Sequence, residues 1–176
     1  AFADGAMGGE RISPLVGDLE EPGLGIDASA LSDVGHVVHL GAVYDLTAGD
    51  EQQATNVQGT AAVAAVAVLL GATMHHVSSI AVAGDHRGVF TENDFDLGQN
   101  FPTPYHRTKF EAEKLVRDSG DVPWRVYRPA IVLGHSETGV IDKVDGPYYF
   151  FGLLKRLRDT LPGWVPLVGL DLGDTN

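Results

Sequence analysis

Short apolar runs alternate with longer helical patterns along this chain, and this alternation restricts the fold more than any other feature. Val37–Leu40 is an apolar run bounded by glycines, which is typical of a strand buried in a parallel sheet. Further strands are expected at Leu15–Asp18, His76–Ile80 and Val126–Tyr127. Helices are expected at 27–34, 51–70, 103–119 and from about 147 onward. Strands that alternate with helices predict βαβ units, and therefore an α/β fold with a mostly parallel sheet flanked by helices.

Three of the expected helices carry specific signals. Thr103 is a good N-cap residue and Pro104 suits the first helical position, so a helix is expected to begin there. The 51–70 helix contains Gly59, and an interior glycine costs about 1 kcal/mol relative to alanine, so close approach of another backbone is expected there. The last helix is expected to bury Phe150, Leu153, Leu154 and Leu157, which recur at helical spacing.

The carboxyl ends of the expected strands carry the residues best suited to a ligand site. Ligands of open α/β sheets lie beyond these ends. The segments found there are Asp18, 40–42, Ser79 and 128–130. Since four separate strand ends agree, we expect the functional site at this side of the sheet.

Tyr105, Lys109 and Ser79 together predict a site for proton transfer during carbonyl reduction. A tyrosine donates a proton to a developing alkoxide at neutral pH only if a nearby positive charge stabilises the phenolate. Lys109 lies one helical turn after Tyr105, on the same face of the expected helix, and supplies that charge. The hydroxyl of Ser79 can hold the substrate oxygen. The alternative is that Tyr105 and Lys109 are ordinary exposed residues of a helix.

Composition and charge exclude several other classes of protein. The chain of 176 residues has a formal net charge of −12, which argues against binding to a nucleic-acid backbone or an anionic membrane surface. It contains no cysteine, so disulfide scaffolds and thiolate metal sites are excluded, and a reducing cytoplasm is the expected compartment. No apolar run reaches the roughly 18 residues that a membrane span needs.

Seven histidines raise the question of a metal site. His36 and His39 fall on opposite faces of their expected strand, and so do His75 and His76. The sequence contains no His-Glu-x-x-His motif or comparable ligand set. No metal site is therefore expected.

Six short motifs, in order along the chain, resemble the extended short-chain dehydrogenase/reductase family. They are Gly17-Asp18-Leu19, His39-Leu40-Gly41-Ala42, Asn56-Val57-Gln58-Gly59-Thr60, Ser78-Ser79, Tyr105-x-x-x-Lys109 and Tyr127-Arg128-Pro129-Ala130. A lone Tyr-x-x-x-Lys is a weak signal, but all six in this order are specific. The resemblance implies a Rossmann-type domain and a nicotinamide cofactor, either NAD(H) or NADP(H).

The resemblance also implies roles for individual residues. Ser79 would hold the substrate oxygen, Tyr105 would act as general acid and base, and Lys109 would hold the nicotinamide ribose. The other implied cofactor-binding residues are Asp18 and Leu19 at the adenine, Gly41 and Ala42 under the cofactor, Asn56 as the residue that pins neighbouring loops, and Pro129 and Ala130 at the nicotinamide carboxamide. Gly41 departs from the family's usual alanine. Asp18 and Asn56 have simpler alternatives, as the cap of a turn and as an ordinary helix residue.

A closer similarity is to the bacterial fatty acyl-CoA (thioester) reductases of that family. It is carried by Tyr44-Asp45, by 77–85, by 105–109 and by 145–151. It implies NAD(P)H-dependent reduction of a long-chain acyl thioester to an aldehyde or alcohol. The aromatic run 148–151 would then line an acyl channel or pack a helix on the sheet. Nucleotide-sugar epimerases and dehydratases share the same catalytic residues, and a non-enzymatic remnant is a third interpretation.

The glycine-rich phosphate loop of that family, with its first two strands, has no counterpart in the sequence. Gly23-Leu24-Gly25 lacks the third glycine, and 5–9 follows no strand. Residues 1–176 are therefore expected to be an internal fragment, a partial Rossmann-type domain in which substrate-binding structure begins at about 135. Without its neighbours the Val37–Leu40 strand would form an exposed edge that favours self-association, unless Leu15–Asp18 pairs with it. The choice between NAD and NADP stays open.

Overall fold

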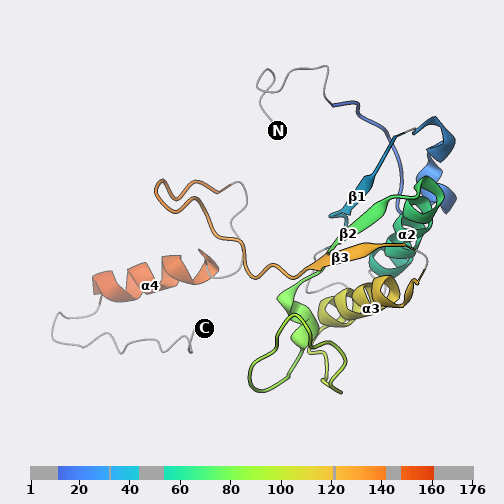
Figure 1. The fold of residues 1–176 in the computed structure, drawn as a ribbon. Helices are drawn as coiled ribbons and strands as arrows, with labels where there is room; N and C mark the ends of the chain where they lie inside the picture. Colours follow the sequence, from blue (N-terminus) through green and yellow to red (C-terminus); the bar gives the residue numbers. More distant parts are fainter. Residues whose placement is uncertain (1–11, 32, 44–53, 121, 142–147, 161–176) are drawn as a thin grey trace. The chain divides into compact units, whose positions relative to one another are not determined.

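The computed structural model describes residues 12–31, 33–43, 54–120, 122–141 and 148–160 (Figure 1). Tyr44-Asp45 and Asp145-Gly146-Pro147, which contribute to the closer resemblance, lie outside these ranges. The chain divides into two compact units, Ala1–Ala130 and Ile131–Asn176. The first unit contains a parallel sheet with two helices, and the second contains one described helix.

The sheet consists of β1 (His36–His39), β2 (Thr73–Val77) and β3 (Trp124–Tyr127), in that order, with all strands parallel. The expected Rossmann-like α/β class, a parallel sheet flanked by crossover helices, is confirmed. β2 begins and ends three residues earlier than expected, so Ser79 lies after the strand rather than inside it.

The two helices of the first unit cover one face of the sheet. α2 (Gly59–Leu70) connects β1 to β2, and α3 (Pro104–Asp118) connects β2 to β3 (Figure 1). The core lies between these helices and the sheet, and its buried residues are Val63, Ala64, Ala67, Met74, Val116 and Val122. On the opposite face of the sheet, Val38 is 59% exposed. Burial of apolar side chains therefore stabilises one face only.

α3 begins where the sequence signals predict. The Thr103 side chain accepts a hydrogen bond from the amide of His106, and Pro104 stands in the first turn. Ser119 is the C-cap residue, so the predicted end of the helix is also confirmed. Local capping chemistry is sufficient to fix both ends of this element.

A π-helical turn, Ala54–Gln58, leads into α2. The helix expected at 51–70 is present from residue 54, while 51–53 lie outside the described residues. A Cβ built on Gly59 would lie 3.0 Å from Leu19 Cβ and 3.5 Å from the Leu19 carbonyl oxygen. The close approach predicted from this interior glycine is confirmed, and it packs the segment before β1 onto α2.

The segment Leu15–Asp18 is not a strand, contrary to the sequence prediction. Val16 is 92% exposed, and the amide of Asp18 donates to the carbonyl of Leu24 at 2.9 Å. Its backbone groups bond locally rather than in a sheet ladder, so the alternative pairing with β1 is wrong as well. The helix expected at 27–34 is reduced to a 3-10 turn, Ala28–Ala30.

α4 (Tyr148–Thr160) is the helix expected from about 147, although Pro147 lies outside the described residues. The prediction that it buries four apolar residues is wrong. Leu154 is half-buried, whereas Phe150, Leu153 and Leu157 are exposed. Among the described residues of its unit, no second helix or strand covers the apolar face. No helix in the described ranges is long and apolar enough to cross a membrane.

Candidate active site

Lys109 of α3 is buried against the end of β2. It is 5% exposed, and its Nζ donates a hydrogen bond of 2.8 Å to the carbonyl of Val77, the last residue of β2. Burial lowers the pKa of Lys109 from 10.5 to about 8, and the nearby Glu113 carboxylate opposes that shift. A positive charge is therefore held at the carboxyl end of the sheet, beside Val77, which lies just before Ser79 in the chain.

Tyr105 lies in the first turn of α3, one helical turn before Lys109. Residues at this spacing share a helix face, so α3 brings the phenol and the ammonium to the same side. Tyr105 is half-buried, and its backbone carbonyl accepts a hydrogen bond of 3.1 Å from Thr108 Oγ1. This bond helps to hold the first turn in place.

Ser79 and Pro129 lie beyond the ends of neighbouring strands. The amide of Ile80 donates to the carbonyl of Pro129 at 3.3 Å, so the two chain segments run together after β2 and β3, and Ala130 follows directly. Ser79 Oγ accepts a hydrogen bond of 3.1 Å from the amide of Ala81. Since the oxygen accepts in that bond, the hydroxyl hydrogen can be donated to another group.

Asn56 joins the loop after β1 to α3. It is 2% exposed; its Oδ1 accepts from the amide of Val43 at 2.7 Å, and its Nδ2 donates to the carbonyl of Val43 at 3.1 Å. The same Nδ2 contacts Thr108 Oγ1 at 3.2 Å. Thr108 precedes Lys109, so Asn56 couples the segment that contains Gly41 and Ala42 to the helix that carries Tyr105 and Lys109.

Asp18 and Leu19 form a second group near the end of β1. Asp18 Oδ1 accepts from the amide of Glu20 at 2.9 Å, so this carboxylate does cap the following turn. Leu19 covers Gly41, where an added Cβ would lie 2.8 Å from Leu19 Cδ1. Both residues line a cavity of about 290 Å³, together with Leu15, Gly17, Leu24 and Ile26.

Sequence reasoning missed a pair of buried histidines beside Lys109. His39 Nε2 lies 3.0 Å from Thr60 Oγ1, which itself donates to the carbonyl of Asn56 at 2.6 Å. His39 must therefore be the donor to Thr60. Burial, with the charge of Lys109 nearby, lowers the pKa of His39 to about 4 and that of His76 to about 3. The sequence could have revealed this pair, because His39 and His76 occupy the positions of two adjacent strands that face the core.

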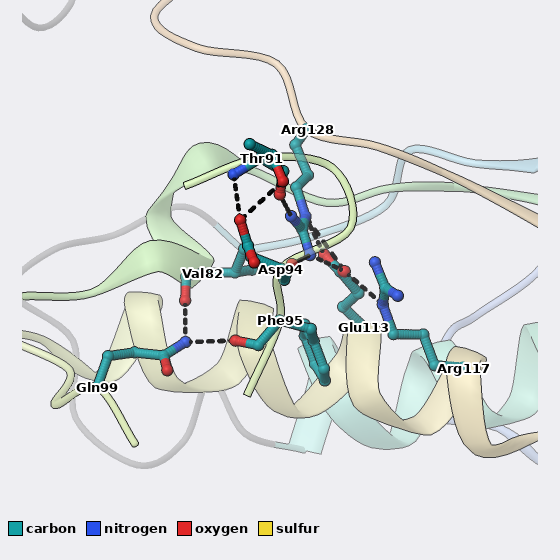
Figure 2. A network of polar contacts seen from close by, with 8 residues as sticks. All are labelled: Val82, Thr91, Asp94, Phe95, Gln99, Glu113, Arg117 and Arg128. Atoms are coloured by element: carbon teal, nitrogen blue, oxygen red, sulfur yellow. Dashed lines mark hydrogen bonds and ion pairs between the residues drawn. The ribbon is translucent and has the colours of Figure 1, made fainter. Parts of the chain in front are cut away.

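A buried ion-pair network was also missed (Figure 2). The Glu113 side chain is 0% exposed and contacts Arg128 Nη2 and Arg117 Nε, each at 2.7 Å. Burial alone would raise the pKa of Glu113, but hydrogen bonds, first from Arg128, outweigh it and hold the pKa below its usual value. Arg128 also donates to the carbonyls of Thr91 at 3.1 Å and Asp94 at 2.9 Å. The network thus ties the loop after β2 to α3 and to the end of β3.

The comparison with protein families identifies the family of the chain. The model of the NAD-binding male sterility protein family matches residues 5–167. The chain belongs to this family. Its relatives are NAD(P)-dependent reductases of the short-chain dehydrogenase/reductase type, as the sequence motifs indicate.

Two curated relatives are much longer than this chain. The aldehyde reductase lnaA of Aspergillus flavus is 29% identical over 155 residues, which cover 77% of this chain and 15% of that protein. The glycine betaine reductase ATRR of Emericella nidulans is 31% identical over 152 residues, which cover 77% of this chain and 12% of that protein. The chain therefore spans less than a fifth of these relatives.

Two solved structures share the fold. The terminal R domain from the myxalamid PKS-NRPS biosynthetic pathway has a TM-score of 0.66 and 27% identity, over 73% of this chain and 36% of that chain. The enzyme WbmG of Bordetella bronchiseptica, in complex with NAD and UDP, has a TM-score of 0.54 and 30% identity, over 69% of this chain and 37% of that chain. Both agree with a Rossmann-like sheet.

Proposed function

We propose that the chain forms the catalytic part of an NAD(P)H-dependent reductase of long-chain fatty acyl thioesters, with Ser79, Tyr105 and Lys109 as its catalytic residues. The observation that carries the proposal is the hydrogen bond from the buried Lys109 Nζ to the carbonyl of Val77. It fixes a positive charge one helical turn from Tyr105 and beside the segment that leads to Ser79. The residues from about 135 onward would begin the substrate-binding region.

The residues present fit a nicotinamide dinucleotide at the end of the sheet. The cavity beside Asp18 has mostly apolar walls and one carboxylate, which suits a flat heterocycle with an exocyclic amine. The proposed cofactor-binding residues are Asp18, Leu19, Gly41, Ala42, Asn56, Tyr105, Lys109, Pro129 and Ala130. When bound, the nicotinamide supplies the hydride that reduces the carbonyl carbon.

The side chains of this chain would manage the oxygen of that carbonyl. Ser79 donates a hydrogen bond to the oxygen as negative charge develops on it. Tyr105 then gives its proton to the same oxygen, and the Lys109 ammonium stabilises the phenolate that remains. Positioned donors at a developing oxyanion are usually the largest catalytic contribution. Loss of the thiol from the reduced carbon leaves an aldehyde.

Removal of one phenolic hydroxyl tests the proposed acid. In the full-length gene product, Tyr105→Phe is expected to lower kcat for NADPH oxidation with palmitoyl-CoA by about 100-fold or more, because positioned general acids contribute at least that much. Tyr127→Phe, at an exposed position of β3 on the open face of the sheet, is the matched control and is expected to retain activity. Near-normal turnover by Tyr105→Phe refutes the assignment.

The rival substrate class is a nucleotide sugar. Its support is the similarity to WbmG, whose structure contains NAD and UDP. The acyl thioester is favoured by the motif similarity and by the exposed apolar side chains of Tyr149, Phe150 and Phe151 on α4, which suit an alkyl chain. Product analysis with palmitoyl-CoA and with a UDP-sugar separates the two, since only one is expected to yield a new product.

The isolated chain is proposed to bind the cofactor weakly and to associate through the edge of β1, which has no neighbouring strand among the described residues. Weak binding is expected because the sequence contains no glycine-rich phosphate loop. Titration calorimetry with NADPH measures it. Micromolar NADPH binding by a monodisperse monomer of the isolated chain would contradict both parts of this proposal. If the full-length product also fails to bind NADPH, a non-enzymatic remnant is favoured.

A further inference from the structure

Two histidines from adjacent strands meet on the open face of the sheet. His36 Nδ1 lies 3.0 Å from His75 Nε2. The parallel register places Val38 opposite His75 and His36 opposite Thr73, so the two imidazoles are diagonal neighbours on one face. Sequence reasoning considered each strand alone and placed His36 and His39 on opposite faces of theirs. It could not pair His36 with His75, because that pairing depends on the register between the two strands.

The separation of the two nitrogens is close to that of two ligands on one metal ion. Imidazoles on a tetrahedral Zn²⁺, with Zn–N bonds of about 2.0–2.1 Å, place their nitrogens about 3.3 Å apart. The ring centroids of His36 and His75 are 5.1 Å apart, with 60° between the ring planes. A change of a few tenths of an ångström in side-chain position would therefore let a cation replace the shared proton.

The second nitrogen of His75 already has the partner that a metal ligand needs. His75 Nδ1 lies 2.8 Å from the Tyr127 hydroxyl, and the two rings are stacked with centroids 5.9 Å apart. When Nδ1 donates to the Tyr127 oxygen, Nε2 keeps its lone pair and points toward His36. Metal-binding histidines commonly have such an oriented second nitrogen.

We propose that His36 and His75 form an exchangeable binding site for a divalent transition metal such as Zn²⁺, with Tyr127 orienting His75 and water completing the coordination. This departs from the expectation of no metal site. Among the residues that the structure describes, no group of three or more His, Cys, Asp or Glu could hold a metal, so this part of the chain supplies two ligands only. The site is on the opposite face of the sheet from Lys109 and does not depend on the proposed reductase activity.

The charges around the pair act in both directions. Arg125 lies opposite His75 in the register of β2 and β3, and its positive charge opposes cation binding. The net charge of −12 attracts cations to the chain as a whole. Metal binding by imidazole competes with protons, so Zn²⁺ binding is measured at pH 7.5.

Titration calorimetry of the 176-residue chain with Zn²⁺ at pH 7.5 tests the site. We expect saturable binding at a single site that is lost in His36→Gln and in His75→Gln. His86→Gln, at a half-buried position in the loop after β2, and His135→Gln, at an exposed position of the second unit, are control variants that should bind Zn²⁺ as the parent does. Circular dichroism of the metal-free variants establishes that each is folded.

Tyr127→Phe separates the proposed site from adventitious binding. Removal of the Tyr127 hydroxyl keeps both ligands but should weaken Zn²⁺ binding about tenfold, as expected for the loss of an orienting hydrogen bond. Absence of saturable Zn²⁺ binding at pH 7.5, or binding that survives both His36→Gln and His75→Gln, overturns the proposal.

Discussion

At the scale of single residues, the buried ammonium of Lys109 has a direct consequence for stability. Lowering its pKa from 10.5 to about 8 corresponds to about 3 kcal/mol of unfavourable free energy at pH 7. Lys109→Met removes that desolvation but leaves the Val77 carbonyl without its donor. We therefore expect a net increase of about 1–2 kcal/mol in the free energy of unfolding at pH 7, measured by urea denaturation.

The pH dependence of the Lys109→Met effect has a definite sign. Between pH 8 and 10.5 the unfolded chain retains the Lys109 proton while the folded chain loses it, so the parent becomes more stable as the pH rises. The advantage of the variant should shrink through that window. A variant that is less stable at pH 7, or whose advantage grows toward pH 10.5, contradicts a buried ammonium at this position.

The buried His76 is predicted to lower the stability of the folded chain as the pH falls. Burial first, and then the charge of Lys109, lower its pKa from 6.5 to about 3. Below pH 6.5 the unfolded chain takes up a proton that the folded chain does not, so this group removes about 1.4 kcal/mol of stability per pH unit. His76→Leu should reduce the stability lost between pH 7 and 5 by about 2 kcal/mol in denaturant titrations. His135→Leu, at an exposed site, is the control variant.

At the scale of elements, the Glu113–Arg128 pair connects α3, β3 and the loop after β2. Removing one partner of a buried ion pair costs about 3–5 kcal/mol, and the lower end of that range applies here because Arg117 still contacts the Glu113 carboxylate when Arg128 is replaced. Arg128→Leu is therefore expected to lower the free energy of unfolding by about this amount. Hydrogen exchange at the Thr91–Asp94 amides should accelerate, because Arg128 holds two carbonyls of that loop.

Two further variants test the Arg128→Leu interpretation. Lys114→Leu removes the exposed 3.6 Å pair with Asp118, and should cost less than about 1 kcal/mol. The double variant Glu113→Leu/Arg128→Leu should recover much of the stability lost in Arg128→Leu, since replacing both charges removes the buried carboxylate that has lost one of its two partners. Equal destabilisation by Arg128→Leu and Lys114→Leu would show that the burial of Glu113 does not determine the loss in the free energy of unfolding.

The elements that sequence reasoning found are those whose signals are local. Thr103 and Pro104 fix the start of α3, and the apolar run around β1 identifies a parallel strand, although only one of its faces is covered. Leu15–Asp18 has the composition of a strand but lacks a partner strand, which no local pattern reveals. The burial predicted for α4 failed for the same reason, since it depends on a second element. The pairing of Glu113 with Arg128 depends on the fold, and so does that of His36 with His75.

At the scale of the whole molecule, the edge of β1 has no neighbouring strand among the described residues. Thr73 donates to the carbonyl of Gly35, so alternate residues from Gly35 face β2 and Val38 presents its amide outward. An exposed edge with unpaired amides promotes association, and a proline there removes one donor without breaking the ladder to β2. Val38→Pro is expected to shift sedimentation from concentration-dependent association toward a single chain. Val37→Pro, on the ladder side, should instead destabilise the fold, and unchanged association of a folded Val38→Pro would mean that another surface is responsible.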